Sequence, residues 1–331
     1  MKDLLFRGAV QLALRTPLHR LLGRGRRTGA AAELDPQLAA IIEGHRLLRL
    51  PAVESMAPAD ARAFVESELG VLDVPSIAMA KITDTTVAGP AGALPVRIYE
   101  PAGASAHWIV YFHGGGGVIG SIHSSDAATR LLAAQTRCTI ASVEYRLGPE
   151  HKHPAAIHDA CAAWDALAAR AGRGKLAVAG DSFGGYLAAQ VDHHTLATGA
   201  RRPDLQVLIY PAVDWTRSLD SHRRLADGYL LTGGFLDWFI THYMHAAEDR
   251  RAASPMFWSE LRGSAPALIV TAGFDPLVDE GDRYVELLRA AGTPVVHRRY
   301  PTLIHGFLSM GGGITAARAA IDELCADIRG L

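Results

Sequence analysis

The sequence predicts an α/β protein with one mainly parallel, eight-stranded sheet, helices on both faces of that sheet, and a helical cap. The first observation is that short apolar runs alternate with Ala- and Leu-rich stretches of helical length. Near-continuous apolar strands that alternate with helices are typical of a parallel sheet buried on both faces. The second is that 49% of the 331 residues are hydrophobic, which is enough for a large core. The third is a pair of helical segments that interrupt the alternation, and these predict the cap.

The eight expected strands fall into two groups. Two β-rich runs between Ser76 and Pro101, IAMAKITDTTV and LPVRIYEP, are separated by the turn sequence GPAGA and should form an antiparallel pair. Six apolar runs follow, with helical stretches between them: WIVYF, CTIASVEY, KLAVAG, LQVLIYP, ALIVTAG and VVHRRYP. These six supply the mainly parallel part of the sheet.

Two segments do not fit the alternation. Residues 1–75 look helical with breaks at prolines, and residues 212–245 are inserted between two strands. The aromatic spacing of FLDWFITHYMH in the insert suits a helix with one apolar face. We expect an N-terminal cap segment at 1–75, an inserted cap segment at 212–245, and a main domain made of 76–211 and 246–331. Alternatively, these helices only decorate the sheet.

The composition argues against several classes of protein. The formal net charge is −1, so the overall charge does not favour nucleic acid or an anionic membrane surface as a partner. The cysteines Cys138, Cys161 and Cys325 lie far apart, without a CxxC pair or Cys/His ligand spacing, which argues against a disulfide framework or a structural zinc. A reducing, cytoplasmic location is the simplest expectation.

The N-terminal region interleaves basic side chains with apolar ones. Arg7 and Gln11 interrupt the apolar runs before they reach the length of a signal peptide, and no small-residue cleavage site follows. No stretch of the chain reaches transmembrane length, so we expect no stable membrane anchoring. Two interpretations remain open: an amphipathic helix on a membrane surface, or a helix packed on the main domain with its cationic face in water.

The strongest local signal is GDSFGG at 180–185, between the run KLAVAG and a helical stretch that starts near Tyr186. Glycines on both sides of Ser182 allow a sharp strand-to-helix turn, which projects the hydroxyl above the end of the sheet. The N-terminus of the following helix favours the negative charge that develops there. This setting predicts Ser182 as a nucleophile.

A glycine run, HGGGG at 113–117, ends the run WIVYF. Attack by a serine on a carboxylic ester passes through a tetrahedral oxyanion, which is stabilised by backbone N–H groups that bare glycines leave accessible. A glycine run can also form a flexible turn. Because a nucleophile follows downstream, we interpret this run as an oxyanion hole, with N–H donors from Gly115, Gly116 and Phe183.

An acid and a base follow Ser182 in the chain order Ser, Asp, His. Asp275 comes just after ALIVTAG and His305 shortly after VVHRRYP, so both are expected at the carboxyl edge of the sheet, where Ser182 lies. Neutral His305 can accept the serine proton and return it to the leaving group, while Asp275 holds its tautomer. We therefore predict a Ser182, Asp275, His305 triad that needs no metal and no cofactor.

Three further carboxylates lie close to these positions in sequence. Asp279 and Glu280 begin the helical stretch VDEGDRYVELLRAAG and are interpreted as residues that serve the N-terminal turn of that helix. Asp181 precedes the nucleophile and should point away from a substrate, which gives it a structural role.

The motifs HGGGGVIGS, EYRLGPEHKHPAA, GDSFGG, SPMFW, DPLVDE and HGF resemble those of the hormone-sensitive-lipase-like family of bacterial carboxylesterases, in the branch with a GDSAGG motif. This resemblance covers most of the chain after residue 77. It implies the α/β-hydrolase fold, with 76–211 and 246–331 as the catalytic domain under a helical cap, and a serine carboxylesterase for small, short-to-medium-chain acyl esters.

The resemblance also implies roles for individual residues and a mode of assembly. His113 is expected to hold the glycine loop, with Gly114 and Asp181 in support. Many members of the family dimerise through the last edge strand, here around Val295 to Tyr300, so a homodimer is possible.

The chain departs from the family pattern at three positions. Phe183 replaces an alanine, Gly117 replaces a frequent aromatic residue, and Gly148 replaces the alanine of YRLAPEH. We hypothesise that positions 183 and 117 have exchanged bulk and have thereby reshaped the acyl pocket.

The same triad can serve other reactions, namely amide or formamide hydrolysis, deacetylation of a sugar or drug, or acyl transfer to an alcohol. Proteins of this fold can also lose the triad and become ligand-binding proteins, but here all three positions hold reactive residue types. A lipase for long triacylglycerols is less expected, because the insert mixes charged residues with its aromatic ones instead of forming a large apolar lid.

Overall fold

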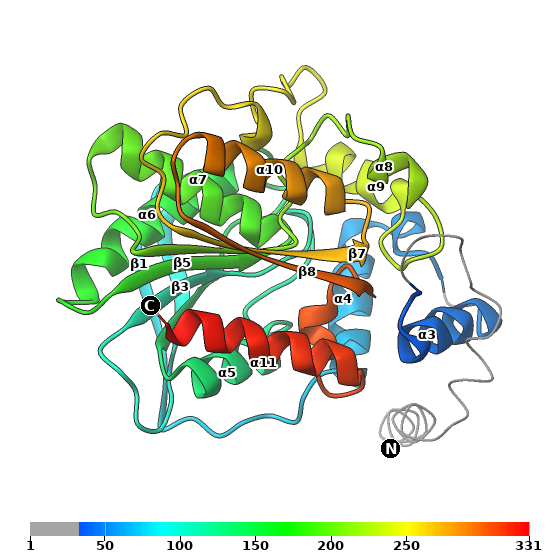
Figure 1. Ribbon diagram of the computed structural model, residues 1–331, viewed down its shortest axis with the longest axis horizontal. Helices are drawn as coiled ribbons and strands as arrows, with labels where there is room; N and C mark the ends of the chain where they lie inside the picture. Colours follow the sequence, from blue (N-terminus) through cyan, green and yellow to red (C-terminus); the bar gives the residue numbers. More distant parts are fainter. Residues whose placement is uncertain (1–32, 50, 331) are drawn as a thin grey trace.

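The computed structural model describes residues 33–49 and 51–330, and its centre is one eight-stranded sheet (Figure 1). The strand order is β1-β2-β4-β3-β5-β6-β7-β8. β1 pairs with β2 and β2 pairs with β4 in antiparallel orientation, and the other neighbouring pairs are parallel. This confirms the predicted sheet. The helix considered for the N-terminal region falls in residues 1–32, outside the described residues.

The strands are short and match the predicted runs closely. Their bounds are β1 (Lys81–Gly89), β2 (Gly92–Glu100), β3 (Trp108–Phe112), β4 (Thr139–Val143), β5 (Leu176–Asp181), β6 (Leu205–Ile209), β7 (Ala267–Phe274) and β8 (Val295–Ile304). The turn at residues 90 and 91 connects the antiparallel pair, whose register joins Gly89 to Gly92.

Helices cover both faces of the sheet, as predicted. In Figure 1, α6, α7 and α10 lie on one face of the sheet, and α5 and α11 lie on the other. Their bounds are α5 (Asp126–Thr136), α6 (Ala155–Arg170), α7 (Phe183–Thr198), α10 (Val278–Ala290) and α11 (Thr315–Arg329). No described helix is long and apolar enough to span a membrane.

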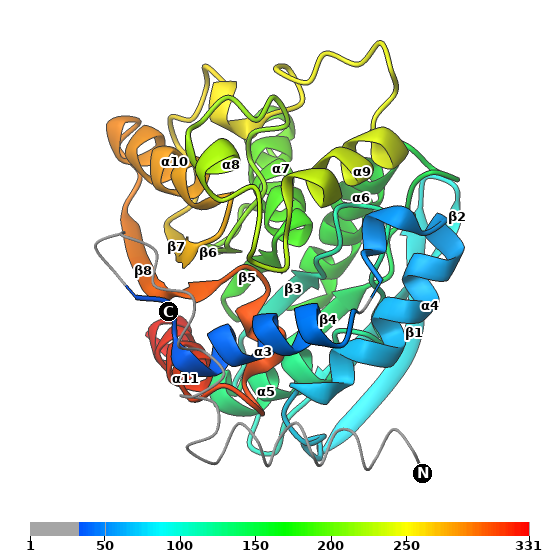
Figure 2. The ribbon, with the colours of Figure 1, turned by 90° about the vertical axis from the view of Figure 1, so that its right-hand side faces the viewer.

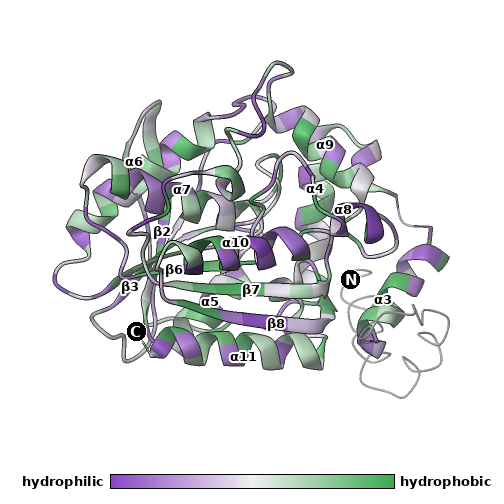
Figure 3. Ribbon diagram, turned by 45° about the horizontal axis from the view of Figure 1, so that its top comes forward, coloured by the Kyte–Doolittle hydropathy of each residue, from purple (hydrophilic) through white to green (hydrophobic). Residues whose placement is uncertain are grey.

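The central strands are buried on both sides. In β5, every residue from Leu176 to Gly180 is buried. Val178 packs in the core layer with α6 and α7, whereas Ala177 and Ala179 pack in the layer on the opposite face. This alternation is the period of two of an extended strand, and it explains why the run is apolar throughout. By contrast, the middle of the edge strand β8 is hydrophilic (Figure 3).

Two helical segments lie together at the end of the sheet toward which β7 and β8 point (Figures 1 and 2). Their helices are α3 (Pro36–Leu47), α4 (Pro58–Glu68), α8 (Ser221–Arg224) and α9 (Gly233–Tyr243). Thr232 Oγ1 donates a hydrogen bond to Glu54 Oε1 at 2.8 Å, and Trp238 Nε1 donates to Met56 O at 3.2 Å. The N-terminal segment and the insert are therefore in direct contact. Short 3-10 helices lie at Val53–Ser55, Leu69–Val71, Pro255–Phe257 and Phe307–Met310.

Candidate active site

Ser182 lies at the junction between β5 and α7, in the setting predicted from its motif. Its backbone has φ 54° and ψ −117°, a strained conformation for a residue with a Cβ atom. Two glycines make the turn possible: a Cβ on Gly180 would lie 2.2 Å from the carbonyl carbon of Gly184, and a Cβ on Gly184 would lie 1.9 Å from Phe112 O. The N–H of Ser182 donates to Ile209 O at 2.8 Å, which holds the turn against β6.

The structure brings the predicted acid and base to Ser182. His305 Nε2 lies 2.9 Å from Ser182 Oγ, and His305 Nδ1 lies 2.7 Å from Asp275 Oδ2. Asp275 is fully buried, and its other carboxylate oxygen accepts a hydrogen bond from Leu277 N at 2.8 Å. A buried carboxylate at Nδ1 orients the imidazole so that Nε2 faces the hydroxyl, the arrangement that a general base requires.

Tyr210 is part of this site, although no sequence motif identified it. Its ring lies against that of His305, with 4.7 Å between ring centroids, and its side chain is buried. Its φ of 38° is unusual for a residue other than glycine. Tyr210 directly follows β6, at the same edge of the sheet as Ser182, and this position in the sequence could have identified it.

The glycine run forms a loop with positive φ angles, 118° at Gly115, 60° at Gly116 and 74° at Gly117. Other residues rarely adopt such angles, and a Cβ on Gly115 would lie 2.1 Å from Ile119 O. Within residues 33–49 and 51–330, no group accepts a hydrogen bond from the N–H of Gly115, Gly116 or Phe183. These three donors are therefore unpaired among the described residues and can donate to a bound, negatively charged oxygen.

Buried side chains behind the glycine loop bond to it. Tyr145 OH donates to His113 O at 2.7 Å, and His113 Nδ1 lies 2.7 Å from Gly114 O. Tyr111 OH donates to Asp181 Oδ1 at 2.6 Å. Burial raises the pKa of Asp181, although the hydrogen bonds from Tyr111 and from the Gly114 N–H favour its charged form. Burial also lowers the pKa of His113. The Asp181 carboxylate thus faces the loop, which supports a structural role.

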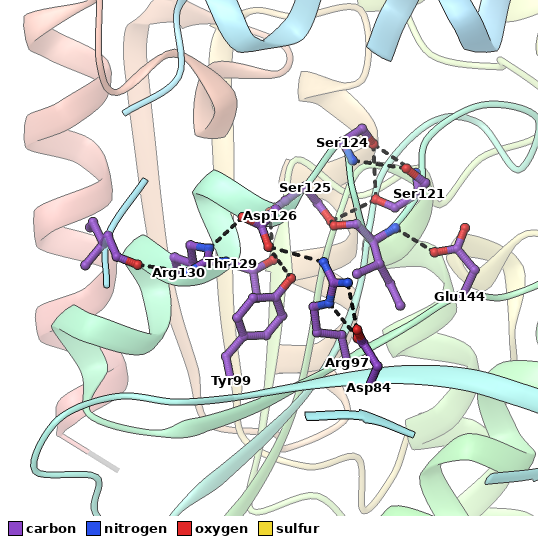
Figure 4. Close-up of polar contacts among 12 residues, drawn as sticks. Asp84, Arg97, Tyr99, Ser121, Ser124, Ser125, Asp126, Thr129, Arg130 and Glu144 are labelled. Carbon is purple, nitrogen blue, oxygen red and sulfur yellow. Dashed lines mark hydrogen bonds and ion pairs between the residues drawn. The ribbon is translucent and has the colours of Figure 1, made fainter. Parts of the chain in front are cut away.

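A polar network holds the segment that follows the glycine loop (Figure 4). Asp126, the first residue of α5, accepts hydrogen bonds from Tyr99 OH at 2.8 Å and from Arg130 Nε at 2.6 Å. Glu144 Oε2 accepts a hydrogen bond from Ile122 N at 2.7 Å. Because Tyr99 belongs to β2 and Glu144 follows β4, the network attaches this segment to the sheet.

Ser182 and His305 line a cavity of about 350 Å³ with mainly apolar walls. Phe239 of α9 lies next to the glycine loop, since a Cβ on Gly116 would lie 2.2 Å from its ring. The glycine loop and both helical segments at the end of the sheet contribute to the walls. The apolar side chains that line the cavity include Val53, Phe64, Val65, Leu230, Leu231, Phe235, Phe239 and Met310.

Phe183 and Gly117 do not line this cavity, so the hypothesis that they reshape an acyl pocket is wrong, although the exchange of bulk between these two positions is confirmed. The side chain is fully buried and meets Tyr243 edge-on, with 4.8 Å between ring centroids, in a cluster that also holds Tyr145 and Trp215. A Cβ on Gly117 would lie 2.7 Å from Phe183 Cζ, so a side chain at 117 and a ring at 183 compete for the same space. The ring thus supports the glycine loop from the side away from the cavity.

Asp279 and Glu280 lie in the first turn of α10, as predicted, but their carboxylates bond to the inserted segment instead of capping the helix, so the capping role is wrong. Glu280 Oε1 accepts a hydrogen bond from Val213 N at 2.6 Å, and Asp279 Oδ2 accepts one from Ser221 N at 2.8 Å. His222 Nε2 lies 2.7 Å from Glu280 Oε2, and both residues are buried. Burial raises the pKa of Glu280 to about 7. Burial lowers the pKa of His222, but the carboxylates of Glu280 and Asp214 together bring it above its ordinary value.

Asp214, His222 and Glu280 are the one group of potential metal ligands in the described part of the chain, with ligand atoms within 4.8 Å of one another. Both Asp214 oxygens already accept hydrogen bonds, Oδ1 from the N–H and hydroxyl of Thr216, and Oδ2 from the N–H and hydroxyl of Ser218. Glu280 Oε1 accepts the hydrogen bond from Val213 N, and Glu280 Oε2 forms an ion pair with His222 Nε2 at 2.7 Å. These contacts explain the cluster as a support for the insert, and we assign no metal to it.

The known proteins that this chain resembles include several ester hydrolases. A family model described as alpha/beta hydrolase fold matches residues 109–309. The chain is 38% identical to carboxylic ester hydrolase LipN of Mycobacterium tuberculosis, over 95% of this chain and 88% of that protein. It is 36% identical to ethyl acetate hydrolase of Pseudomonas putida, over 86% of this chain and 95% of that protein. A solved structure, the hyperthermophilic esterase of the archaeon Pyrobaculum calidifontis, is 34% identical with a TM-score of 0.82, over 90% of this chain and 99% of that chain.

Proposed function

Because the chain belongs to the hormone-sensitive-lipase-like carboxylesterases of the α/β-hydrolase family, we propose that Ser182, His305 and Asp275 form the catalytic triad with which it hydrolyses carboxylic esters. The position of His305 carries this proposal. Its Nε2 lies 2.9 Å from Ser182 Oγ and its Nδ1 lies 2.7 Å from Asp275 Oδ2, so one imidazole connects a nucleophile to a buried carboxylate.

In the acylation half of the reaction, His305 Nε2 accepts the Ser182 hydroxyl proton while Oγ bonds to the ester carbonyl carbon. The carbonyl oxygen becomes negatively charged, and the N–H groups of the glycine loop and of Phe183 donate to it. The bond to the alkoxy oxygen then breaks, and the imidazolium gives its proton to the leaving alcohol. Asp275 holds the tautomer with its proton on Nδ1 and stabilises the imidazolium.

In the deacylation half, a water molecule attacks the acyl carbon and His305 Nε2 accepts a proton from it. A second tetrahedral oxyanion forms in the same position. Its collapse breaks the bond between the acyl carbon and Oγ, Ser182 takes the proton back from His305, and the carboxylic acid leaves. The residues present are sufficient for every proton transfer in this cycle.

Ser182→Ala tests the proposal, with p-nitrophenyl butyrate as substrate. We expect kcat to fall by at least about 10³-fold, because among the described residues Ser182 is the hydroxyl that lies within hydrogen-bond distance of His305 Nε2. Ser309→Ala is the matched control, since Ser309 also lines the cavity and its substitution should preserve activity. Turnover by Ser182→Ala at the wild-type rate would show that Ser182 is not the nucleophile.

Short-to-medium-chain acyl esters are the substrates that we propose. A cavity of about 350 Å³ with apolar walls supports this choice, because it is at the small end of ligand-binding pockets. A series of p-nitrophenyl esters from C2 to C16 tests it. We expect kcat/KM to be highest for short and medium chains, and a maximum at C16 would contradict the proposal.

The proposed cap consists of two segments, 1–75 and 212–245, over a catalytic domain formed by 76–211 and 246–331. Its support comes from the hydrogen bond between Thr232 and Glu54 and from the side chains that both segments contribute to the cavity. A double-mutant cycle of Glu54→Ala and Thr232→Ala on the free energy of unfolding tests the contact. We expect a coupling of about 0.5–1.5 kcal/mol, and additive effects would contradict it.

A homodimer through β8 is our proposal for the assembly. β8 is an edge of the sheet, and Val296 on it is 49% exposed, so a second copy of the chain can pair there. Light scattering after size-exclusion chromatography tests this proposal. We expect a dimer for the wild type and a monomer for Val296→Asp, whereas a monomeric wild type would contradict the proposal.

The cytoplasm is the location that we propose. The three cysteines are free thiols in the structure, two of them buried, which suits a reducing compartment. Cell fractionation with an antibody against the chain tests this location, and recovery from the membrane or the medium would contradict it.

A further inference from the structure

The glycine loop needs support from outside its own sequence. Four consecutive glycines, Gly114 to Gly117, lose more conformational freedom on ordering than other residues do. Inside the loop, Gly115 O accepts hydrogen bonds from the N–H groups of Val118 and Ile119, each at 3.0 Å. The turn supplies no hydrogen-bond donor to the Val118 carbonyl oxygen, so a donor has to come from another part of the chain.

Arg62, on α4 of the N-terminal segment, donates to that carbonyl. Its Nε lies 2.8 Å from Val118 O, and its Nη2 lies 2.7 Å from Gly148 O. The same guanidinium binds both carboxylate oxygens of Glu150, at 3.0 Å and 2.7 Å. The Arg62 side chain is 27% exposed, whereas that of Glu150 is 54% exposed. Arg62 is therefore the more buried partner of this ion pair.

The residues around Gly148 reach the glycine loop from a second side. Gly148 N donates to Gly117 O at 2.7 Å, so Arg62 bonds to one residue of the loop directly and to another through Gly148. Lys152 Nζ, four residues further along, donates to Thr241 O at 2.8 Å at the end of α9. The segment 147–153 therefore contacts the glycine loop, α4 and α9.

We propose that Arg62 is a positioning residue for the oxyanion hole, through which docking of α4 controls the rate of ester hydrolysis. The inference rests on the proposed function, because it assigns Arg62 to the same reaction. A guanidinium that donates to two carbonyl oxygens fixes their separation, since its N–H groups have a rigid planar geometry. With α4 docked, Arg62 holds Val118 O, and this keeps the loop in the arrangement in which the N–H groups of Gly115 and Gly116 have no acceptor of their own in the described part of the chain. Without Arg62, the loop samples arrangements in which these donors point elsewhere.

The experiment compares Arg62→Ala and Arg62→Lys with Glu150→Gln in the full chain. Glu150→Gln removes the charge pair but leaves both carbonyl contacts of Arg62, so it is the matched control. Each variant is measured for kcat and KM with p-nitrophenyl butyrate, and for inhibition by a trifluoromethyl ketone, whose adduct with a serine carries an oxyanion. Urea unfolding reports whether each variant is folded.

We expect Arg62→Ala to lower kcat on the order of tenfold, less than the roughly 10²–10³-fold loss of an oxyanion-hole donor itself. Inhibition by the ketone should weaken by a similar factor, while KM changes by less. Arg62→Lys should lie in between, because an ammonium has no planar fork for two carbonyls. Glu150→Gln should stay within about twofold of the wild type, since the carboxylate is an exposed partner.

Two results would overturn the inference: an unchanged kcat in a folded Arg62→Ala or Arg62→Lys, or equal losses in Arg62→Ala and Glu150→Gln. A rise in KM with unchanged kcat and unchanged ketone inhibition would assign Arg62 to cap packing alone. If Arg62→Ala does not fold, the comparison of Arg62→Lys with Glu150→Gln decides. If Ser182→Ala turned over substrate as fast as the wild type, the proposed function would be rejected. That result does not depend on Arg62, so failure of the proposed function can be distinguished from failure of this inference.

Discussion

Phe183→Ala separates support of the glycine loop from a role in substrate selection. The ring of Phe183 is fully buried, so its removal leaves a cavity among aromatic side chains that cannot easily collapse. Truncation of a buried phenylalanine costs about 3–5 kcal/mol of unfolding free energy. The edge-on contact with Tyr243 is lost as well, and such pairs contribute about 0.5–1.5 kcal/mol beyond burial. We therefore expect a loss near the upper end of the first range.

The assay has two parts, urea unfolding and kcat/KM over p-nitrophenyl esters from C2 to C16. Because Phe183 does not line the cavity, the variant should lose activity by a similar factor at every chain length. Phe239→Ala is the positive control, since Phe239 lines the cavity and its truncation should move the optimum toward longer chains. A shifted optimum in Phe183→Ala, with an unshifted one in Phe239→Ala, would refute the reasoning.

Two further predictions concern the acids of the 275–280 segment. Asp275→Asn should lower kcat by about 10³–10⁴-fold, because the proton on His305 Nδ1 loses its carboxylate acceptor. Asp279→Asn is the control and should retain most activity, since Asp279 bonds to Ser221 N. Equal losses in the two variants would contradict the assignment of Asp275 as the acid. The pKa values of both Glu280 and His222 are raised in the folded chain, so the folded state holds more protons than the unfolded one from about pH 4.5 to above pH 7. The free energy of unfolding should then fall by about 1–3 kcal/mol as pH rises through this window. Glu280→Gln should make the free energy of unfolding depend less on pH. Identical pH profiles for the wild type and Glu280→Gln would contradict this explanation.

The features that could be predicted from the sequence are those encoded locally. Each strand is a short apolar run between turn residues, and Ser182 is marked by the glycines on either side of it. Asp275 and His305 could be chosen among many acids and histidines because each follows a predicted strand. The carboxyl edge of a parallel sheet then brings residues from distant positions together.

The features that could not be predicted depend on how distant segments pack. Arg62 is 56 residues from Val118 in the chain, and no local pattern connects a helix of the N-terminal segment to the glycine loop. Glu280 has the sequence position of a helix-capping acid, but the insert that packs on α10 buries it and supplies backbone donors. The ring of Phe183 points into the aromatic cluster because Tyr243 of the insert completes that cluster, which a pattern around residue 183 cannot show.

The most direct test of the central claim is covalent labelling with a p-nitrophenyl phosphonate ester, followed by mass spectrometry of the intact chain and of its peptides. The phosphonate is expected to add once, on the peptide that contains Ser182, with loss of activity in proportion. His305→Ala should slow the labelling strongly, and Ser182→Ala should abolish it. Labelling at another residue that abolishes activity, or labelling of Ser182→Ala at the wild-type rate, would contradict the assignment of Ser182 as the nucleophile.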